Sequence, residues 1–126
     1  MNPRQWIAAG AVTAGVAVGL GAFGAHGLEE RLKEAGTIAI WETGVRSQAW
    51  HSLGLILFGL FQERHRGGNG IAWSFLVGMA LFSGSLYGLA LGGPKGVLGP
   101  MTPVGGLALL AGWTLFAVRA LRRPEA

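Results

Sequence analysis

Cysteine and aspartate are both absent from this chain of 126 residues. Without cysteine, the chain forms no disulfide, no thiolate metal site and no cysteine nucleophile. The G-x-S-x-G and H-E-x-x-H motifs of common hydrolases and metalloproteases are also missing. We therefore expect no enzymatic activity, no catalytic residue and no cofactor. An intramembrane enzyme acting on lipid remains the alternative, although no nucleophile–base pair can be named for it.

Charge is scarce as well. Charged residues make up 13% of the chain and hydrophobic residues 51%, with a mean hydropathy of +0.45. An ordinary soluble domain has about 25% charged residues. The formal net charge is +4, but no basic run is interleaved with aromatics as a nucleic-acid surface requires. The basic residues are typical of span ends that meet lipid headgroups, so we expect membrane lipid and not nucleic acid as the partner.

What the chain does contain is long apolar stretches. Each is about long enough to cross a bilayer, which takes roughly 20 residues. The first follows Arg4 and resembles a signal peptide, but it is too long for one, so we interpret it as a retained helix. The sequence therefore predicts one domain over residues 1–126, an all-α integral membrane four-helix bundle. The predicted spans are Trp6–Ala25, Val45–Phe61, Ile71–Leu91 and Val104–Leu121.

A hydrophilic connection, His26–Gly44, separates the first two spans. Within it, Leu28, Leu32 and Ala35 recur at helical spacing, and Gly36 follows. This pattern predicts a short amphipathic helix that lies on the membrane surface with its apolar side toward lipid. The sequence leaves open whether residues 26–44 stay on the surface or pack into the bundle.

The distribution of basic residues predicts the orientation. With four spans, both termini and the second turn share one side of the membrane. The other side has fewer basic residues, Arg31, Lys33, Arg46 and Lys95, diluted by four glutamates. Since basic residues favour the cytoplasm, we predict that both termini are cytoplasmic. The side assigned to the cytoplasm holds Arg4, Arg64, Arg66, Arg119, Arg122 and Arg123.

Small residues recur four apart in three spans. Such pairs let the backbones of membrane helices approach closely. They predict helix packing, either between copies of the chain in a homo-oligomer or within one Gly-rich bundle. The pairs are Gly15 with Gly19, Gly84 with Gly88, and Ala108 with Gly112.

Polar residues gather toward the predicted non-cytoplasmic side. Gly44, Gln48, His51 and Leu55 lie along one helical face of the second span. Polar groups near a span end are costly in hydrocarbon, so they should face the bundle interior or an aqueous vestibule. The candidate ligand-binding or proton-relay residues are His26, Glu42, Arg46, Gln48, His51, Tyr87 and Thr102.

Two interpretations of this cluster stay open. It forms either a pocket for a small ion, proton or polar headgroup, or a hydrogen-bond network that fixes helix packing. Histidine titrates near neutrality and can pass protons, which favours the first. In the second, Glu42 and Arg46, four residues apart, form an ordinary ion pair. His26, His51 and Glu42 are ligand types that zinc accepts, but their spacing does not support a metal site, and we predict none.

Four ordered segments, Gly21–Leu28, Glu42–Gly54, Phe82–Tyr87 and Thr102–Gly106, resemble the domain-of-unknown-function family 423. Its members are small bacterial inner-membrane proteins, related to transmembrane protein 256 of eukaryotes. The resemblance covers essentially the whole chain. It implies a four-helix protein of the bacterial inner membrane and brings no established activity.

The sequence thus supports two functional hypotheses. In the first, the chain binds or passes a small ion, proton or polar headgroup at its His/Gln/Tyr cluster, in a homo-oligomer. In the second, it is an accessory or structural protein that joins a larger membrane complex through its Gly-rich helix faces.

Overall fold

The structure, a computed structural model, describes residues 1–122. All regular secondary structure in these residues is helical, which confirms the all-α part of the predicted fold. Arg123, one of the basic residues behind the predicted orientation, lies outside the described residues, as does the end of the predicted domain. The helices are α1 (Pro3–Ala25), α2 (Glu29–Ala35), α3 (Ile38–Gln62), α4 (Asn69–Ala90) and α5 (Lys95–Leu121).

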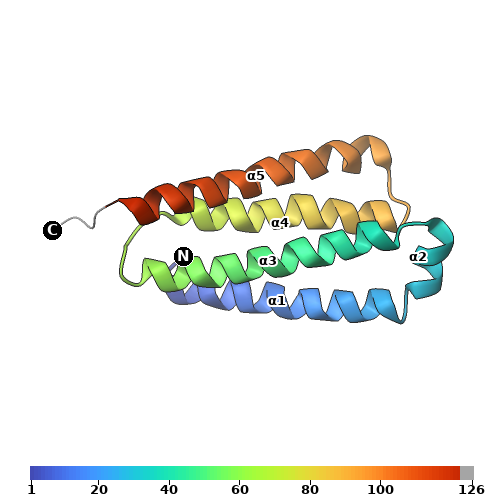
Figure 1. Cartoon of the computed structure of the whole chain (residues 1–126), viewed down its shortest axis with the longest axis horizontal. Helices are drawn as coiled ribbons and strands as arrows, with labels where there is room; N and C mark the ends of the chain where they lie inside the picture. The colour runs from blue at the N-terminus through green and yellow to red at the C-terminus, as the bar shows by residue number, and fades with distance from the viewer. Residues whose placement is uncertain (123–126) are drawn as a thin grey trace.

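The four long helices lie side by side along the long axis of the molecule, and α2 lies across one end (Figure 1). The main contacts join α1 to α3, α3 to α4 and α4 to α5. The N-terminus and the last described turn of α5 share the end that carries the α3–α4 connection. The opposite end carries α2 and the α4–α5 connection. The two central helices, α3 and α4, therefore have neighbours on both sides.

Three of the helices, α1, α4 and α5, are long and apolar enough to cross a membrane. Helix α3 has 25 residues, which is sufficient length, but its first half is too polar to qualify by composition. The polar residues there include Glu42, Arg46 and Gln48. Composition thus supports three of the four predicted spans. The span that it does not support is α3, because this helix carries the polar cluster.

All four long helices begin before the predicted spans, and α3 and α5 differ the most. Helix α3 begins at Ile38, so Ile38–Gly44 belongs to a long helix and not to the connection. Helix α5 begins at Lys95 and continues through Pro100 and Pro103. Proline is tolerated in a membrane helix where the neighbouring helices compensate for the lost backbone bond.

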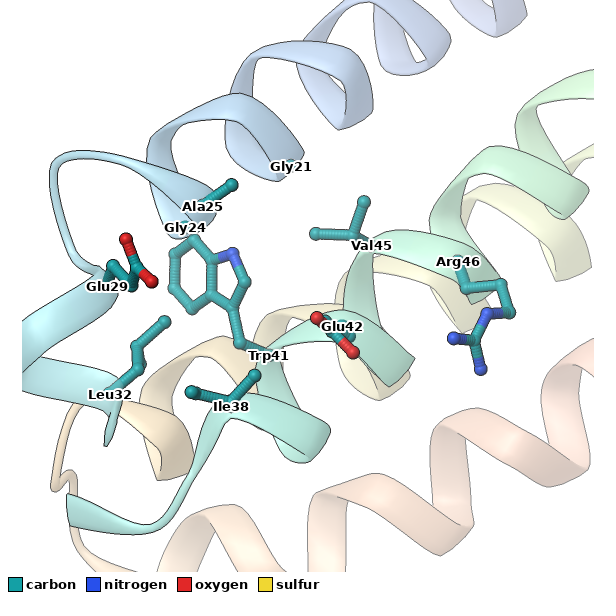
Figure 2. Close-up of a pocket in the computed structure, with 10 residues that line it drawn as sticks. All are labelled: Gly21, Gly24, Ala25, Glu29, Leu32, Ile38, Trp41, Glu42, Val45 and Arg46. Atoms are coloured by element: carbon teal, nitrogen blue, oxygen red, sulfur yellow. The ribbon is translucent and has the colours of Figure 1, made fainter. Parts of the chain in front are cut away.

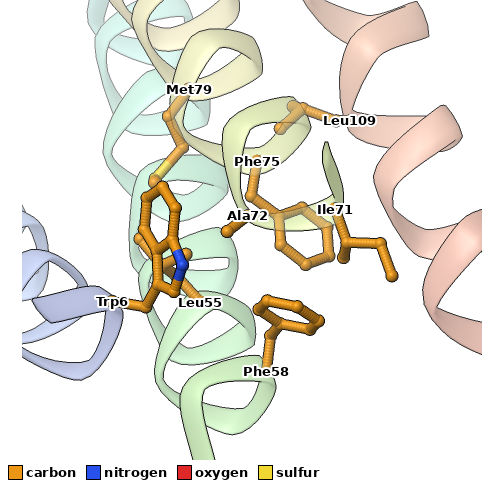
Figure 3. Close-up of a cluster of buried hydrophobic side chains, with 8 residues drawn as sticks. All are labelled: Trp6, Leu55, Phe58, Ile71, Ala72, Phe75, Met79 and Leu109. Atoms are coloured by element: carbon orange, nitrogen blue, oxygen red, sulfur yellow. The ribbon is translucent and has the colours of Figure 1, made fainter. Parts of the chain in front are cut away.

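The main apolar core lies between α3 and α4 and is completed by Trp6 of α1 and Leu109 of α5 (Figure 3). The Trp6 indole is fully buried and meets Trp73 edge to face, with ring centroids 5.1 Å apart. The outer faces of α1 and α5 expose large apolar side chains, including Val12 and Leu107. An apolar outer surface of this kind is typical of helices that are surrounded by lipid.

The short helix α2 forms as predicted and ends at Gly36, whose φ of 70° suits glycine. Its apolar residue Leu32 is buried against Trp41 and Ala90. This side of α2 therefore faces the long helices and not lipid, contrary to the prediction. The Thr37 hydroxyl donates to the Ala90 carbonyl at 2.8 Å. These contacts pack α2 onto the end of the long helices.

The glycine pairs predicted from spacing divide into two groups. A Cβ at Gly88 or Gly112 would lie 2.7 Å from Leu98 or 2.9 Å from Phe75, so both glycines pack within the chain. A Cβ at Gly15, Gly19 or Gly84 would meet open space, so these glycines face outward, and Ala108 is partly exposed. Other glycines allow the closest helix approaches, among them Gly10 of α1 and Gly78 of α4.

Candidate functional site

The Gln48 side chain connects three helices. Its amide Nε2 donates to the Thr13 carbonyl of α1 at 2.8 Å, and its Oε1 accepts from the Tyr87 hydroxyl of α4 at 2.7 Å. Gln48 is only 8% exposed. The predicted proximity of Gln48 and Tyr87 is therefore present in the structure. Thr13 was missed, since an isolated threonine in an apolar span carries no sequence signal.

Small residues surround this connection. The Ser83 hydroxyl donates to the Gly44 carbonyl at 2.8 Å, and the Ser52 hydroxyl donates to the Thr13 hydroxyl at 2.8 Å. Both serines are buried. A Cβ at Gly44 would lie 2.8 Å from Cε1 of Tyr87, so glycine leaves room for the tyrosine ring. Sequence spacing placed Gly44 on the correct face but did not identify Ser52.

His51 connects α3 to α5 instead of to Gln48. Its Nε2 accepts from the Trp113 indole N–H at 2.9 Å, and its Nδ1 lies 2.7 Å from the Ser47 carbonyl. An indole N–H only donates and a carbonyl only accepts, so these partners require a neutral ring with its proton on Nδ1. Both ring nitrogens are satisfied. Trp113, a residue that sequence analysis missed, completes this pair.

Thr102 belongs to a separate contact. Its hydroxyl lies 2.6 Å from the Ser85 hydroxyl, which joins α4 to α5. Ser85 is fully buried and also donates to the Phe82 carbonyl. No hydrogen bond within residues 1–122 connects Thr102 to Gln48 or His51.

The remaining predicted site residues lie outside these networks. His26 caps the end of α1 and is exposed, as are Glu42 and Arg46. In the described chain no ion pair joins Glu42 to Arg46, so the predicted pair is absent although the residues are one turn apart. Nor do the residues described here bring three His, Asp or Glu side chains together for a metal. The seven candidates thus form no common pocket, because they point to different neighbours around α3.

Two cavities flank the outer face of α3. The first, of about 500 Å³, lies between α1, α2 and α3, and the Trp41 indole forms part of its wall (Figure 2). Its charged residues are Glu29, Glu42 and Arg46. The Trp41 indole N–H donates to the Leu20 carbonyl at 3.0 Å, which holds the ring against α1. This cavity is therefore mixed in character, with carboxylates, one guanidinium and an apolar wall.

The second cavity is a groove of about 580 Å³ between α3 and α5, with Phe82 of α4 at its base. Its lining is apolar except near one end, where Arg46, Thr43 and Ser47 contribute. Arg46 lines both the groove and the first cavity. The other residues of the groove are Trp50, His51, Pro103, Gly106, Leu107, Leu109, Leu110 and Trp113.

A third cavity, of about 510 Å³, lies at the opposite end of the molecule beside Arg4 and Arg66. Gln62 lines it and donates to Asn69 Oδ1 at 2.7 Å, an atom that also accepts from the Trp6 indole at 3.0 Å. This contact ties the start of α1 to the α3–α4 connection. Sequence analysis did not identify Gln62 or Asn69, because polar residues at a helix end are ordinary.

Comparison with known proteins places the chain in a family. Residues 20–106 match the model of the family described as "Protein of unknown function (DUF423)". This segment contains α3, α4 and most of the contacts described above. No solved structure matches the chain.

Curated relatives match along nearly their whole length. A UPF0382 membrane protein of Staphylococcus epidermidis is 41% identical over 120 residues, which cover 94% of this chain and 97% of the relative. The UPF0382 membrane protein YwdK of Bacillus subtilis is 38% identical over 122 residues, covering 94% and 98%. The UPF0382 inner membrane protein YgdD of Escherichia coli is 40% identical over 127 residues, covering 97% and 93%. The chain belongs to this family of membrane proteins of unknown function, DUF423, as its sequence motifs predict.

Proposed function

We propose that the chain is an integral protein of the bacterial inner membrane with four spans, α3 being the fourth, and with α2 at the interface. The polar groups of α3 support this topology, because Gln48, His51 and Ser52 all have partners on other helices. Paired in this way, they can lie at membrane depth. Five of the described basic residues lie at the end with the α3–α4 connection, against four toward the other end, which favours cytoplasmic termini. The five are Arg4, Arg64, Arg66, Arg119 and Arg122.

The Gln48 network favours a structural role over a proton relay. Nε2 and Oε1 of the Gln48 amide both have protein partners. An amide also does not exchange protons as histidine or a carboxyl group does. His51 is likewise paired with Trp113 and Ser47. Polar contacts between membrane helices contribute about 0.6 kcal/mol each on average. Several such contacts are enough to fix the packing of α1, α3, α4 and α5.

We propose binding, not catalysis, as the function, and a polar headgroup as the ligand among the three predicted classes. The headgroup of an amphiphile would bind at Arg46, and its apolar part would occupy the α3–α5 groove. One observation supports this most: Arg46 lines both the mixed cavity and the apolar groove. An amphiphile has this same combination of a polar end and an apolar end.

Lipid retention tests this function. The protein would be purified in a mild detergent, exposed to bilayer phospholipid, and examined by native mass spectrometry for bound lipid. Arg46→Gln should reduce the retained lipid, whereas Arg66→Gln, at the opposite end, should not. Equal retention by both variants and the unmodified protein would reject Arg46 as the headgroup site.

Self-association or attachment to a larger membrane complex is the second candidate function. It is favoured by Gly15 and Gly19 of α1, where an added Cβ would meet no atom of residues 1–122 within 4 Å. Another backbone could approach there closely. Replacing both glycines by leucine should shift a crosslinked oligomer to monomer in native membranes, and Gly96→Leu serves as an open-space control on α5. An unchanged crosslinking pattern would count against this face.

A further inference from the structure

We infer that the amphiphile is a phospholipid whose headgroup carries a primary amine, as phosphatidylethanolamine does, with its phosphate at Arg46, its ammonium at Glu42 and an acyl chain in the α3–α5 groove. This inference rests on the proposed function and specifies its ligand. Three features support it: the free guanidinium, the carboxylates beside it and the apolar groove.

Arg46 is suited to the phosphate. Its side chain is exposed, and no carboxylate within residues 1–122 forms an ion pair with it. It lies on the third turn of α3, in from the end that carries α2, where an unpaired cation in a membrane helix extends toward the headgroups. A guanidinium binds phosphate through two parallel hydrogen bonds, which makes phosphate a better partner than water at this depth.

The carboxylates select the rest of the headgroup. Glu29 and Glu42 line the first cavity together with Arg46, so its charged groups sum to −1. Figure 2 shows Glu42 one turn from Arg46 and Glu29 on the other side of the Trp41 indole. A headgroup of net negative charge would be repelled by these carboxylates. A zwitterionic headgroup instead matches both signs, with an ammonium that donates hydrogen bonds to Glu42.

The groove suits an acyl chain. From Arg46 it continues between α3 and α5 along Trp50, Leu107, Leu110 and Trp113. The His51 ring also lines it, but both of its nitrogens are already paired, so the ring offers the chain no unsatisfied polar atom. One chain can therefore bury its methylenes in the groove without leaving a buried polar group unpaired.

The test compares three phospholipids with the same acyl chains and ethanolamine, choline or glycerol headgroups. Binding of each to the purified protein would be measured by native mass spectrometry. We expect the ethanolamine lipid to bind about fivefold more tightly than the glycerol lipid, the ratio that corresponds to one exposed ion pair. The choline lipid should bind more weakly than the ethanolamine lipid, because its quaternary ammonium donates no hydrogen bond.

Variants separate the two proposals. Glu42→Gln should abolish the preference for the ethanolamine lipid and leave overall binding in place, whereas Arg46→Gln should weaken the binding of all three lipids. Glu63→Gln and Arg66→Gln at the opposite end are matched controls, which should change neither the preference nor the overall binding. These side chains are all exposed, so the variants should fold, which their melting curves would verify.

The outcomes distinguish failure of the amine inference from failure of the proposed function. Equal binding of the three lipids that still depends on Arg46 would overturn the amine inference and leave the proposed function intact. Binding independent of Arg46 would overturn both. Soluble phosphoethanolamine provides the last comparison: if it displaced the lipid at equal concentration, the acyl chain would contribute nothing and the groove assignment would be wrong.

Discussion

Trp113 of α5 donates its indole N–H to Nε2 of His51 on α3, at 2.9 Å. The two helices share few other contacts, since the groove separates them and α4 lies beneath. One hydrogen bond between side chains therefore bridges the groove. Trp113 also stacks edge to face on Phe75, with ring centroids 4.7 Å apart, so the indole is held from two directions.

Removing this bridge should destabilise the protein. Trp113→Phe keeps an aromatic ring and leaves His51 Nε2 without its donor, at a cost of about 1 kcal/mol. The measurement is thermal or denaturant unfolding of the solubilised protein.

In ¹⁵N spectra, His51 of the unmodified protein should have the neutral tautomer with its proton on Nδ1. A proton on Nε2 would contradict the Trp113 bond.

The Tyr87–Gln48 bond yields a prediction of coupling. Tyr87→Phe leaves Gln48 Oε1 unpaired and should destabilise the protein by about 1 kcal/mol. Gln48→Leu leaves both the Tyr87 hydroxyl and the Thr13 carbonyl without this partner, so it should cost more. The double variant should lose less than the sum, because it leaves neither partner of this bond unsatisfied. Additive losses would show that the bond contributes nothing. Lipid binding at Arg46 should be unchanged in all three.

Gly44 should not tolerate a side chain. A Cβ there would lie 2.8 Å from the Tyr87 ring, so Gly44→Ala must displace the ring or separate α3 from α4. Overpacking of this kind costs roughly 1–3 kcal/mol. Gly84→Ala is the matched control on α4, because its Cβ would meet open space. Equal melting temperatures for the two variants would contradict the packing of Tyr87 on Gly44.

Topology can be tested without altering the background, since the chain has no cysteine. Single cysteines would replace Glu34 in α2 and Arg64 in the α3–α4 connection. We expect an impermeant thiol reagent added to intact spheroplasts to label the cysteine at position 34 and not that at position 64. Labelling at position 64 alone would place both termini outside the cytoplasm. Labelling of both in intact cells would rule out α3 as a span between them.

Sequence patterns predicted the helices well where the cause is local. The apolar runs of α1 and α4 and the stop at Gly36 were correct, because helix length, hydropathy and a left-handed glycine depend on neighbouring residues. The start of α5 was wrong. Pro100 and Pro103 indicate a loop locally, and the helix continues through them because α4 supports it.

The composition of this chain determined by itself that its surface is apolar and that no thiol chemistry is possible. Its spacing placed Gly44, Gln48 and His51 on one face of α3. Only the tertiary structure decided their partners, because Thr13 and Trp113 lie on helices far apart in sequence. Within residues 1–122 it also left Glu42 and Arg46 without an ion pair, with both residues lining the first cavity and Arg46 also lining the groove. Hydrogen-bond partners depend on how helices pack, and that information does not exist in any single segment.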